Sequence, residues 1–173
     1  MNDSDPQRGS MTHANPGPAV PPDAVASTTD AAIDPAILAA IPHRPPMLLV
    51  ERILERSDDR IVCEKTFTSD EFFVQGHYPG QPIVPGVILC ESAMQSGAVL
   101  LSDKADASAG VPVATRINEV KFKRMVRPGD TIRIEARLTE RLADAFFMTA
   151  KITVDGQLAA RLDFACAIAK ANG

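Results

Sequence analysis

One segment limits the fold of this chain more than any other, because it predicts a helix that is apolar almost all the way round. Residues 84–103 have the length and spacing of an α-helix. Apolar side chains cover most of its circumference: Val87, Ile88, Leu89, Ala93, Met94, Ala98, Val99, Leu100 and Leu101. A helix without a polar face is buried rather than lying half in water. The rest of the chain must therefore supply a surface that surrounds it.

Alternating apolar and polar residues predict strands on both sides of this helix. The predicted strands are residues 47–55, 60–68, 115–125, 131–140, 146–154 and 157–169. The pair Asp155-Gly156 predicts a two-residue hairpin between the last two strands. One buried helix with five or six mostly antiparallel strands predicts an α+β fold, in which a curved sheet wraps around the helix. Such a sheet leaves part of the helix bare, which favours a dimer.

The first 34 residues differ from the rest of the chain. They are rich in Pro, Asp, Ser, Thr, Asn and Ala, and they show no hydrophobic period. Such a segment cannot bury enough apolar surface to offset the entropy lost on ordering. We therefore predict a disordered tail at residues 1–34 and a single folded domain at residues 35–173. Asp34 followed by Pro35 predicts a short helical turn at the start of that domain.

Composition and charge exclude several classes of protein. The 18 Lys and Arg residues are outnumbered by 22 Asp and Glu residues, which gives a net charge of −4. A net negative charge argues against a general nucleic-acid-binding protein. Cys63, Cys90 and Cys166 are odd in number and widely spaced, so we expect inert buried thiols, no metal site, and a reducing, cytoplasmic location. No apolar run has the length of a membrane span, and no signal-peptide pattern opens the sequence.

The loop that enters the predicted helix carries an acid/base pattern. His77 lies in a Gly/Pro-rich turn, and Glu91 follows fourteen positions later inside the apolar helix. Imidazole titrates near neutral pH and is a natural base. Burial favours the protonated form of a carboxyl group, which makes Glu91 a natural acid. Taken alone, a histidine in such a loop is more often structural, and a buried glutamate can also be one half of an ion pair.

Three blocks of sequence strengthen the catalytic interpretation by their order and spacing. They are Ile41-Pro42-His43-Arg44-Pro45-Pro46-Met47-Leu48-Leu49-Val50-Glu51-Arg52, then Phe73-Val74-Gln75-Gly76-His77-Tyr78-Pro79-Gly80-Gln81-Pro82-Ile83-Val84-Pro85-Gly86-Val87 continuing to Glu91 and Gln95, then Val120-Lys121-Phe122-Lys123-Arg124-Met125-Val126-Arg127-Pro128-Gly129-Asp130. Together they resemble the FabZ-type 3-hydroxyacyl-acyl-carrier-protein dehydratases of type II fatty-acid synthesis, which have a hotdog fold. The likeness runs from about residue 36 to about residue 169.

This resemblance implies a hydro-lyase that converts (3R)-3-hydroxyacyl-ACP to trans-2-enoyl-ACP and water, without a metal or organic cofactor. It implies that His77 and Glu91 are catalytic and come from opposite subunits of a homodimer. Members of the family often assemble further, as trimers of dimers. The partner that delivers the substrate would be acyl carrier protein.

Several further residues are candidates for supporting roles. Gly86 stands at the helix N-terminus, where free N–H groups can stabilise negative charge on the thioester oxygen. Gln95, four residues after Glu91, either orients that carboxylate or fills the dimer seam. We expect His43 to organise its loop rather than to catalyse. A basic cluster is either a docking surface for an acidic carrier protein or a solvated strand edge; it consists of Lys121, Lys123, Arg124 and Arg127.

Other functions on the same fold stay open from the residues alone. An acyl-thioesterase would aim a water molecule at the carbonyl carbon and usually carries a different motif from the His77 block. The related FabA-type dehydratase/isomerase usually has Asp where Glu91 stands. A non-catalytic acyl-binding protein would need neither His77 nor Glu91. In the dehydratase, Glu91 either donates its proton directly or orients a water molecule that does so. Phe122, Met125 and Met94 are candidates to line an apolar tunnel for the acyl chain.

Overall fold

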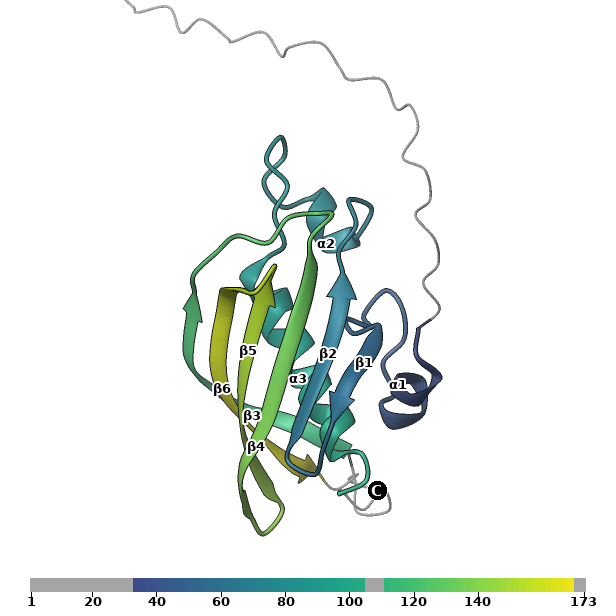
Figure 1. Ribbon diagram of the computed structural model, residues 1–173, viewed down its shortest axis with the longest axis vertical. Helices are drawn as coiled ribbons and strands as arrows, with labels where there is room; N and C mark the ends of the chain where they lie inside the picture. Colours follow the sequence, from purple (N-terminus) through teal and green to yellow (C-terminus); the bar gives the residue numbers. More distant parts are fainter. Residues whose placement is uncertain (1–32, 105–110, 170–173) are drawn as a thin grey trace, which may run out of the picture. The chain divides into compact units, whose positions relative to one another are not determined.

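The computed structural model describes residues 33–104 and 111–169, the side chain of residue 111 excepted. The elements follow one another as α1 (Pro35–Ala40), β1 (Arg52–Arg56), β2 (Arg60–Thr66), α2 (Phe72–Gln75), α3 (Gly86–Leu101), β3 (Val111–Phe122), β4 (Thr131–Leu142), β5 (Ala145–Val154) and β6 (Gln157–Ala169) (Figure 1). Asp34 caps α1, because its Oδ1 accepts the Ala36 N–H at 2.9 Å. Of the disordered tail predicted for residues 1–34, residues 1–32 lie outside the described residues.

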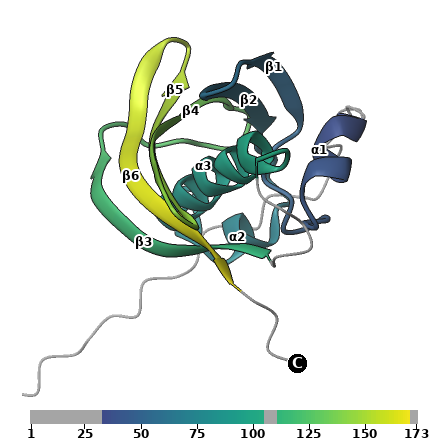
Figure 2. The ribbon, with the colours of Figure 1, turned by 90° about the horizontal axis from the view of Figure 1, so that it is seen from below.

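The described strands form one antiparallel sheet in the order β1-β2-β4-β5-β6-β3. The sheet curves around α3, which lies in its hollow (Figure 2). This confirms the predicted α+β fold. The hairpin between β5 and β6 is also confirmed: Asp155 and Gly156 have φ angles of 51° and 76°, as a two-residue type I′ turn requires.

The core lies between α3 and the concave face of the sheet. Most residues of α3 are buried, as are the inward side chains of the central strands. Gly97 permits this close packing. A Cβ atom placed on Gly97 would lie 2.8 Å from the Phe164 ring and 3.0 Å from the Met148 sulfur. Only glycine therefore lets the helix approach β5 and β6 without displacing these side chains.

One stripe of α3 is not covered by the sheet. Val87 is 72% exposed, and Glu91, Met94 and Ala98 are partly exposed. Their spacing places them on a single face of the helix. The predicted burial is therefore correct for most of the circumference but not for Glu91, whose side chain keeps 28% of its exposure in this chain. The physical reason is that the sheet does not reach this stripe.

The first predicted strand, residues 47–55, is wrong in its first half, since β1 begins only at Arg52. The backbone just before β1 forms hydrogen bonds with a side chain instead of with a neighbouring strand. The Leu49 N–H donates to Gln95 Oε1, and Gln95 Nε2 donates to the Met47 carbonyl, both at 2.8 Å. Leu49 is nevertheless fully buried, which explains why the apolar pattern resembles that of a strand.

The short helix α2 has no counterpart among the predicted elements, because four residues are too few to show a helical period. It begins after Glu71 and buries Val74. The Phe73 ring packs edge-on against Phe67, with 5.8 Å between ring centroids. Helix α2 leads directly into the loop that carries His77.

Candidate active site

His77 is held in a fixed orientation by its own loop. Its backbone N–H donates to the Val74 carbonyl at 3.1 Å, which ties it to the end of α2. Its Nδ1 lies 3.1 Å from the Ile83 carbonyl oxygen. A carbonyl can only accept, so Nδ1 carries the hydrogen of this bond and the neutral ring has its lone pair on Nε2. The loop thus presents an imidazole in the tautomer that can act as a base through Nε2.

A tight turn follows His77. The Gln81 N–H donates to the Tyr78 carbonyl at 3.0 Å, and Gly80 has a φ angle of +87°. With Pro79 before it, Gly80 has the conformation of the third residue of a type II turn, which favours glycine. The predicted Gly/Pro turn is confirmed, and its geometry brings Ile83 back to the imidazole.

Glu91 is oriented by Gln95. The Gln95 amide is buried and fixed by the backbone, because the Leu49 N–H requires an oxygen opposite it and the Met47 carbonyl requires an N–H. Nε2 therefore faces Glu91 and donates to its Oε1 at 2.9 Å. Of the two roles considered for Gln95, this geometry favours orientation of the carboxylate. Glu91 Oε2 receives no hydrogen bond within the described residues.

His43 approaches the same carboxylate from the loop after α1. Its Nε2 lies 3.7 Å from Glu91 Oε1, and its buried Nδ1 has no hydrogen-bond partner among the described residues. The loop itself is organised by Arg44, whose guanidinium donates to the carbonyls of Leu38, Ile41 and His43 at 2.7–3.0 Å. The organising role expected of His43 thus belongs to its neighbour, a residue that the sequence pattern did not single out.

No hydrogen bond or ion pair joins His77 to Glu91 within the described part of the chain. Each belongs to a separate group: His77 with α2 and Ile83, and Glu91 with Gln95 and His43. Within the described chain, the candidate base and the candidate acid are therefore held separately, each by its own hydrogen bonds.

The N-terminus of α3 offers free backbone donors. Neither Gly86 nor Val87 donates its N–H to a residue that the structure describes outside the helix, as expected for the first turn of a helix. The space beside Gly86 is occupied by Phe122: a Cβ atom there would lie 2.7 Å from the ring. The missing side chain of Gly86 thus makes room for a phenylalanine of the same chain, a reason for glycine that the sequence did not reveal.

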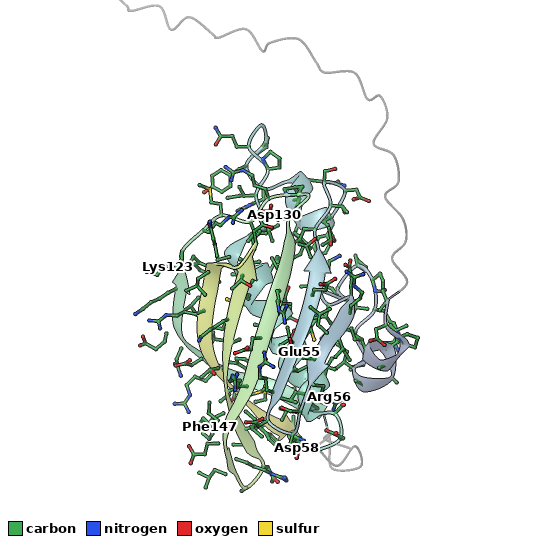
Figure 3. The ribbon with its side chains drawn as sticks, viewed as in Figure 1. Glu55, Arg56, Asp58, Lys123, Asp130 and Phe147 are labelled. Atoms are coloured by element: carbon green, nitrogen blue, oxygen red, sulfur yellow. The ribbon has the colours of Figure 1, made fainter. Side chains whose placement is uncertain are left out.

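The four basic candidates differ in how they are engaged. Arg124 donates to the Val154 carbonyl at 3.1 Å and pairs with Asp155 at 3.7 Å. Lys121 lies 3.8 Å from a neighbouring carboxylate, Glu119. Lys123 and Arg127 form no ion pair within the described residues and are exposed. Figure 3 shows Lys123 at the outer edge of the molecule, beside β3.

Comparison with known proteins identifies the family of this site. The family model described as "FabA-like domain" matches residues 41–163. The chain belongs to the FabA-like family. Curated relatives include the 3-hydroxyacyl-[acyl-carrier-protein] dehydratase FabZ of Streptococcus pyogenes serotype M3, 42% identical over 75% of this chain and 95% of the relative. The FabZ of Oenococcus oeni is 43% identical over 73% of this chain and 92% of the relative.

Solved structures agree with the FabA-like assignment at the level of the fold. The dehydratase heterocomplex ApeI:P from Xenorhabdus doucetiae matches with a TM-score of 0.67 and 18% identity, over 78% of this chain and 91% of that one. The E. coli PaaI protein of the phenylacetic acid degradation operon matches with a TM-score of 0.55 and 17% identity, over 66% and 80%. The predicted hotdog fold is thereby confirmed.

Three other properties bear on the FabA-like site. Within the described ranges, no group of three His, Cys, Asp or Glu side chains is arranged to hold a metal ion. No helix of those ranges is long and apolar enough to cross a membrane. Cys63, Cys90 and Cys166 are buried free thiols, and burial raises the pKa of Cys63 and of Cys166 to about 11.

Proposed function

We propose that this chain dehydrates (3R)-3-hydroxyacyl-ACP to trans-2-enoyl-ACP and water, with His77 as the base and Glu91 as the acid. The observation that carries the proposal is the His77 Nδ1 hydrogen bond to Ile83, which leaves Nε2 free to take a proton. Nε2 removes the proton from C2, and the electron pair of that bond forms the C2–C3 double bond. The C3 hydroxyl leaves as water, protonated by Glu91 or by a water molecule that Glu91 orients.

Gln95 supports the acid in this proposal. Its amide donates to Glu91 Oε1, so a proton on the carboxyl would sit on Oε2. Oε2 is then the oxygen that faces the leaving hydroxyl. His43 Nε2 lies 3.7 Å from Oε1, the same oxygen that Gln95 holds. It therefore approaches the carboxyl group from the side opposite the proposed leaving hydroxyl.

Gly86 is proposed to stabilise the developing negative charge on the thioester oxygen. Its free N–H lies at the positive end of α3. Phe122 beside it is 52% exposed within the chain, so the ring is able to turn aside when the thioester arrives. One such donor is worth roughly 3 kcal/mol of barrier. Gly86→Ala would obstruct the approach, and we expect kcat to fall on the order of 10²-fold; unchanged kcat would remove Gly86 from the proposal.

We further propose that the active site is completed by a second copy of the chain, which supplies His77 to the Glu91 of its partner. Two features support a dimer. The uncovered stripe of α3 is apolar around Glu91. The edge strand β3 has no neighbour on one side within the described sheet, and unpaired edges invite pairing with another chain. Exposed apolar side chains lie along it: Val113, Ile117, Val120 and Phe122.

Mixing two inactive variants tests whether sites are shared between subunits. His77→Ala and Glu91→Gln homodimers should each be nearly inactive. In a mixed dimer, the intact His77 of one chain would meet the intact Glu91 of the other, and one of the two sites would be restored. Statistical exchange should therefore recover about a quarter of wild-type activity. No recovery, although mass analysis shows mixed dimers, would contradict a shared site.

The proposed partner is acyl carrier protein, and Lys123 and Arg127 are the strongest docking candidates of the basic cluster. Both are exposed and form no ion pair within the described residues. Lys121 and Arg124 would contribute charge while engaged with their neighbours. Charge complementarity mainly affects encounter and KM. Lys123→Glu with Arg127→Glu should raise KM for the ACP thioester, and leave turnover of a short pantetheine thioester unchanged. An equal effect on both substrates would contradict docking.

We propose the predicted division into a catalytic domain at residues 35–173 and a disordered tail before it; Asp34, the last residue of the predicted tail, is ordered as the cap of α1. The proposal also places the enzyme in the cytoplasm, where three free thiols are expected to stay reduced.

Direct turnover is the test of the activity itself. Wild type, His77→Ala and Glu91→Gln would receive 3-hydroxyacyl-ACP of several chain lengths, and enoyl product would be followed by mass. We expect turnover in the wild type and a drop on the order of 10²-fold or more in each variant. A folded, dimeric wild type that forms no enoyl product from any chain length would refute the dehydratase. Thioester hydrolysis or acyl binding without reaction would then be examined.

A further inference from the structure

Lys65 forms a largely buried ion cluster with Glu51 and Glu71. It lies near the end of β2 on the face shared by Ile61 and Cys63, which are fully buried, and its own side chain is only 10% exposed. Its Nζ lies 2.9 Å from Glu51 Oε1 and 2.8 Å from Glu71 Oε1. Burial opposes the charge of Lys65, but the hydrogen bonds and negative charges of the two glutamates outweigh burial and raise the pKa of Lys65.

Stability alone is a weak explanation for such a cluster. Taking charged groups out of water is costly. Apolar residues of similar volume often give a folded protein of equal or greater stability. A buried cluster of this kind can instead hold one arrangement of the chain against others. The two carboxylates that Lys65 engages belong to different parts of the fold, so their contacts have different consequences.

Glu51 joins Lys65 to the sheet. Its Oε2 accepts the Thr66 N–H at 3.0 Å, and its own N–H donates to the Glu64 carbonyl at 2.9 Å. This half of the cluster holds the chain before β1 against β2. Its side-chain contacts reach no residue of the His77 loop.

Glu71 joins Lys65 to the His77 loop. Its carbonyl accepts the Val74 N–H at 2.9 Å and the Gln75 N–H at 3.3 Å, so Glu71 begins α2. The Val74 carbonyl in turn accepts the His77 N–H. Helix α2 has four residues and no side-chain cap. So short a helix has little stability of its own and depends on contacts such as this one.

We propose that Lys65, through its ion pair with Glu71, is a positioning residue for His77. The ion pair fixes where α2 begins, α2 fixes the His77 backbone, and the loop closed at Ile83 then aims Nε2. The inference rests on the proposed function, since it takes His77 as the base. It adds residues that no part of the acid/base pattern includes.

Glu51→Gln and Glu71→Gln form a matched pair for the test. Each removes one negative charge from the same lysine and keeps the shape of the side chain. Full-length protein of each variant would be compared by urea unfolding, by kcat and KM for 3-hydroxyacyl-ACP, and by 15N NMR of histidine-labelled protein. We expect both variants to be less stable. Only Glu71→Gln should lower kcat, by about 10-fold to 10²-fold at similar KM, since small misplacement of a catalytic group has effects of that size.

NMR separates positioning from stability. In the wild type, His77 should show one protonated and one unprotonated ring nitrogen, as the Nδ1 hydrogen bond requires. In Glu71→Gln, the imidazole should exchange between its two tautomers, which averages the two 15N signals. In Glu51→Gln, both signals should stay unchanged. A second variant, Lys65→Met with Glu71→Leu, removes both charges of this ion pair. It leaves Glu51 without its lysine partner, so it should be less stable than the wild type, and its kcat should still be low.

Equal kcat in Glu71→Gln and Glu51→Gln would overturn the proposal, as would wild-type His77 signals in Glu71→Gln. A double variant with wild-type kcat would also overturn it. Failure of the proposed function looks different: the wild type itself would make no enoyl product. In that event the NMR comparison still decides whether Lys65 and Glu71 position the imidazole.

Discussion

Gly97→Ala tests how tightly α3 packs into the sheet. The added methyl group would lie 2.8 Å from the Phe164 ring and 3.0 Å from the Met148 sulfur. Both distances are well below the roughly 3.5–4.0 Å of a relaxed contact between carbon atoms. Phe164 is 2% exposed and Met148 1% exposed, so neither side chain has free space into which it can move.

Two opposing effects set the size of the change. Alanine is a better helix former than glycine by about 1 kcal/mol. Overpacking a filled core costs about 1–3 kcal/mol. Because Phe164 is rigid and enclosed, we place the cost at about 2 kcal/mol and the net loss of unfolding free energy at about 1 kcal/mol. For a chain of this length, that loss corresponds to roughly 2–4 °C in Tm.

Urea unfolding of Gly97→Ala, Phe164→Leu and the double variant measures this packing directly. If the Phe164 ring opposes the new methyl group, Gly97→Ala should cost less stability in the Phe164→Leu background than in the wild type. The double-mutant cycle should therefore show coupling of about 0.5–1 kcal/mol. A Gly97→Ala protein as stable as wild type, or strict additivity of the two changes, would refute the close approach of α3 to β6.

Three other predictions concern polar and titratable groups. Gln95→Leu leaves a buried N–H and a partly buried carbonyl unpaired, so the unfolding free energy should fall by about 2–3 kcal/mol, measured in urea. The hydrogen bond from Arg137 lowers the pKa of Glu135 below its ordinary value. Its contribution to stability is then present above about pH 4.5 and lost as pH falls through the lower folded value, so stability should fall more steeply below about pH 5 in wild type than in Glu135→Gln. The buried thiols of Cys63 and Cys166, with pKa raised to about 11, should react with a disulfide reagent at pH 8 only in denaturant; fast reaction of the folded protein would contradict their burial.

The strands of the last third were predictable because two independent signals agree there. Side chains alternate between the core and the solvent, and turn residues mark where each strand ends. Asp155-Gly156 defines the last hairpin, and β6 has the predicted bounds of Gln157–Ala169. The edge strand is less well defined by its sequence: β3 runs over Val111–Phe122 instead of the predicted residues 115–125, because an exposed edge lacks the alternation of a half-buried strand.

Segments whose hydrogen bonds go to distant side chains were not predictable. Residues 47–51 have the apolar character of a strand, but the backbone of Leu49 pairs with Gln95, 46 positions later. No local pattern reveals that pairing. The contact of His43 with Glu91 is hidden for the same reason. By contrast, Gln95 and Glu91 are four residues apart on one helix, and their contact follows from the helical repeat.

A lysine on an apolar face was the signal that could have revealed the ion cluster. The alternation of β2 places Lys65 on the face of Ile61 and Cys63, where a lone charge is costly. Such a position requires an opposite charge from elsewhere in the chain. The sequence does not say which of its 22 acidic residues supplies that charge, because Glu51 and Glu71 meet Lys65 only through the fold.

The placement of Glu91 links catalysis to assembly. Glu91, the proposed acid, lies on the stripe of α3 that the described chain leaves uncovered, and His77, the proposed base, lies on a separate loop. Water around a carboxyl group favours its ionised form, and removal of water favours the acid form. On the proposed dimer, the second chain would therefore do two things at once: it would bring His77 to the substrate and exclude water from Glu91. Within the described chain, the sheet buries the other faces of α3 and leaves the stripe of Glu91 uncovered, so on this proposal both effects come from the partner.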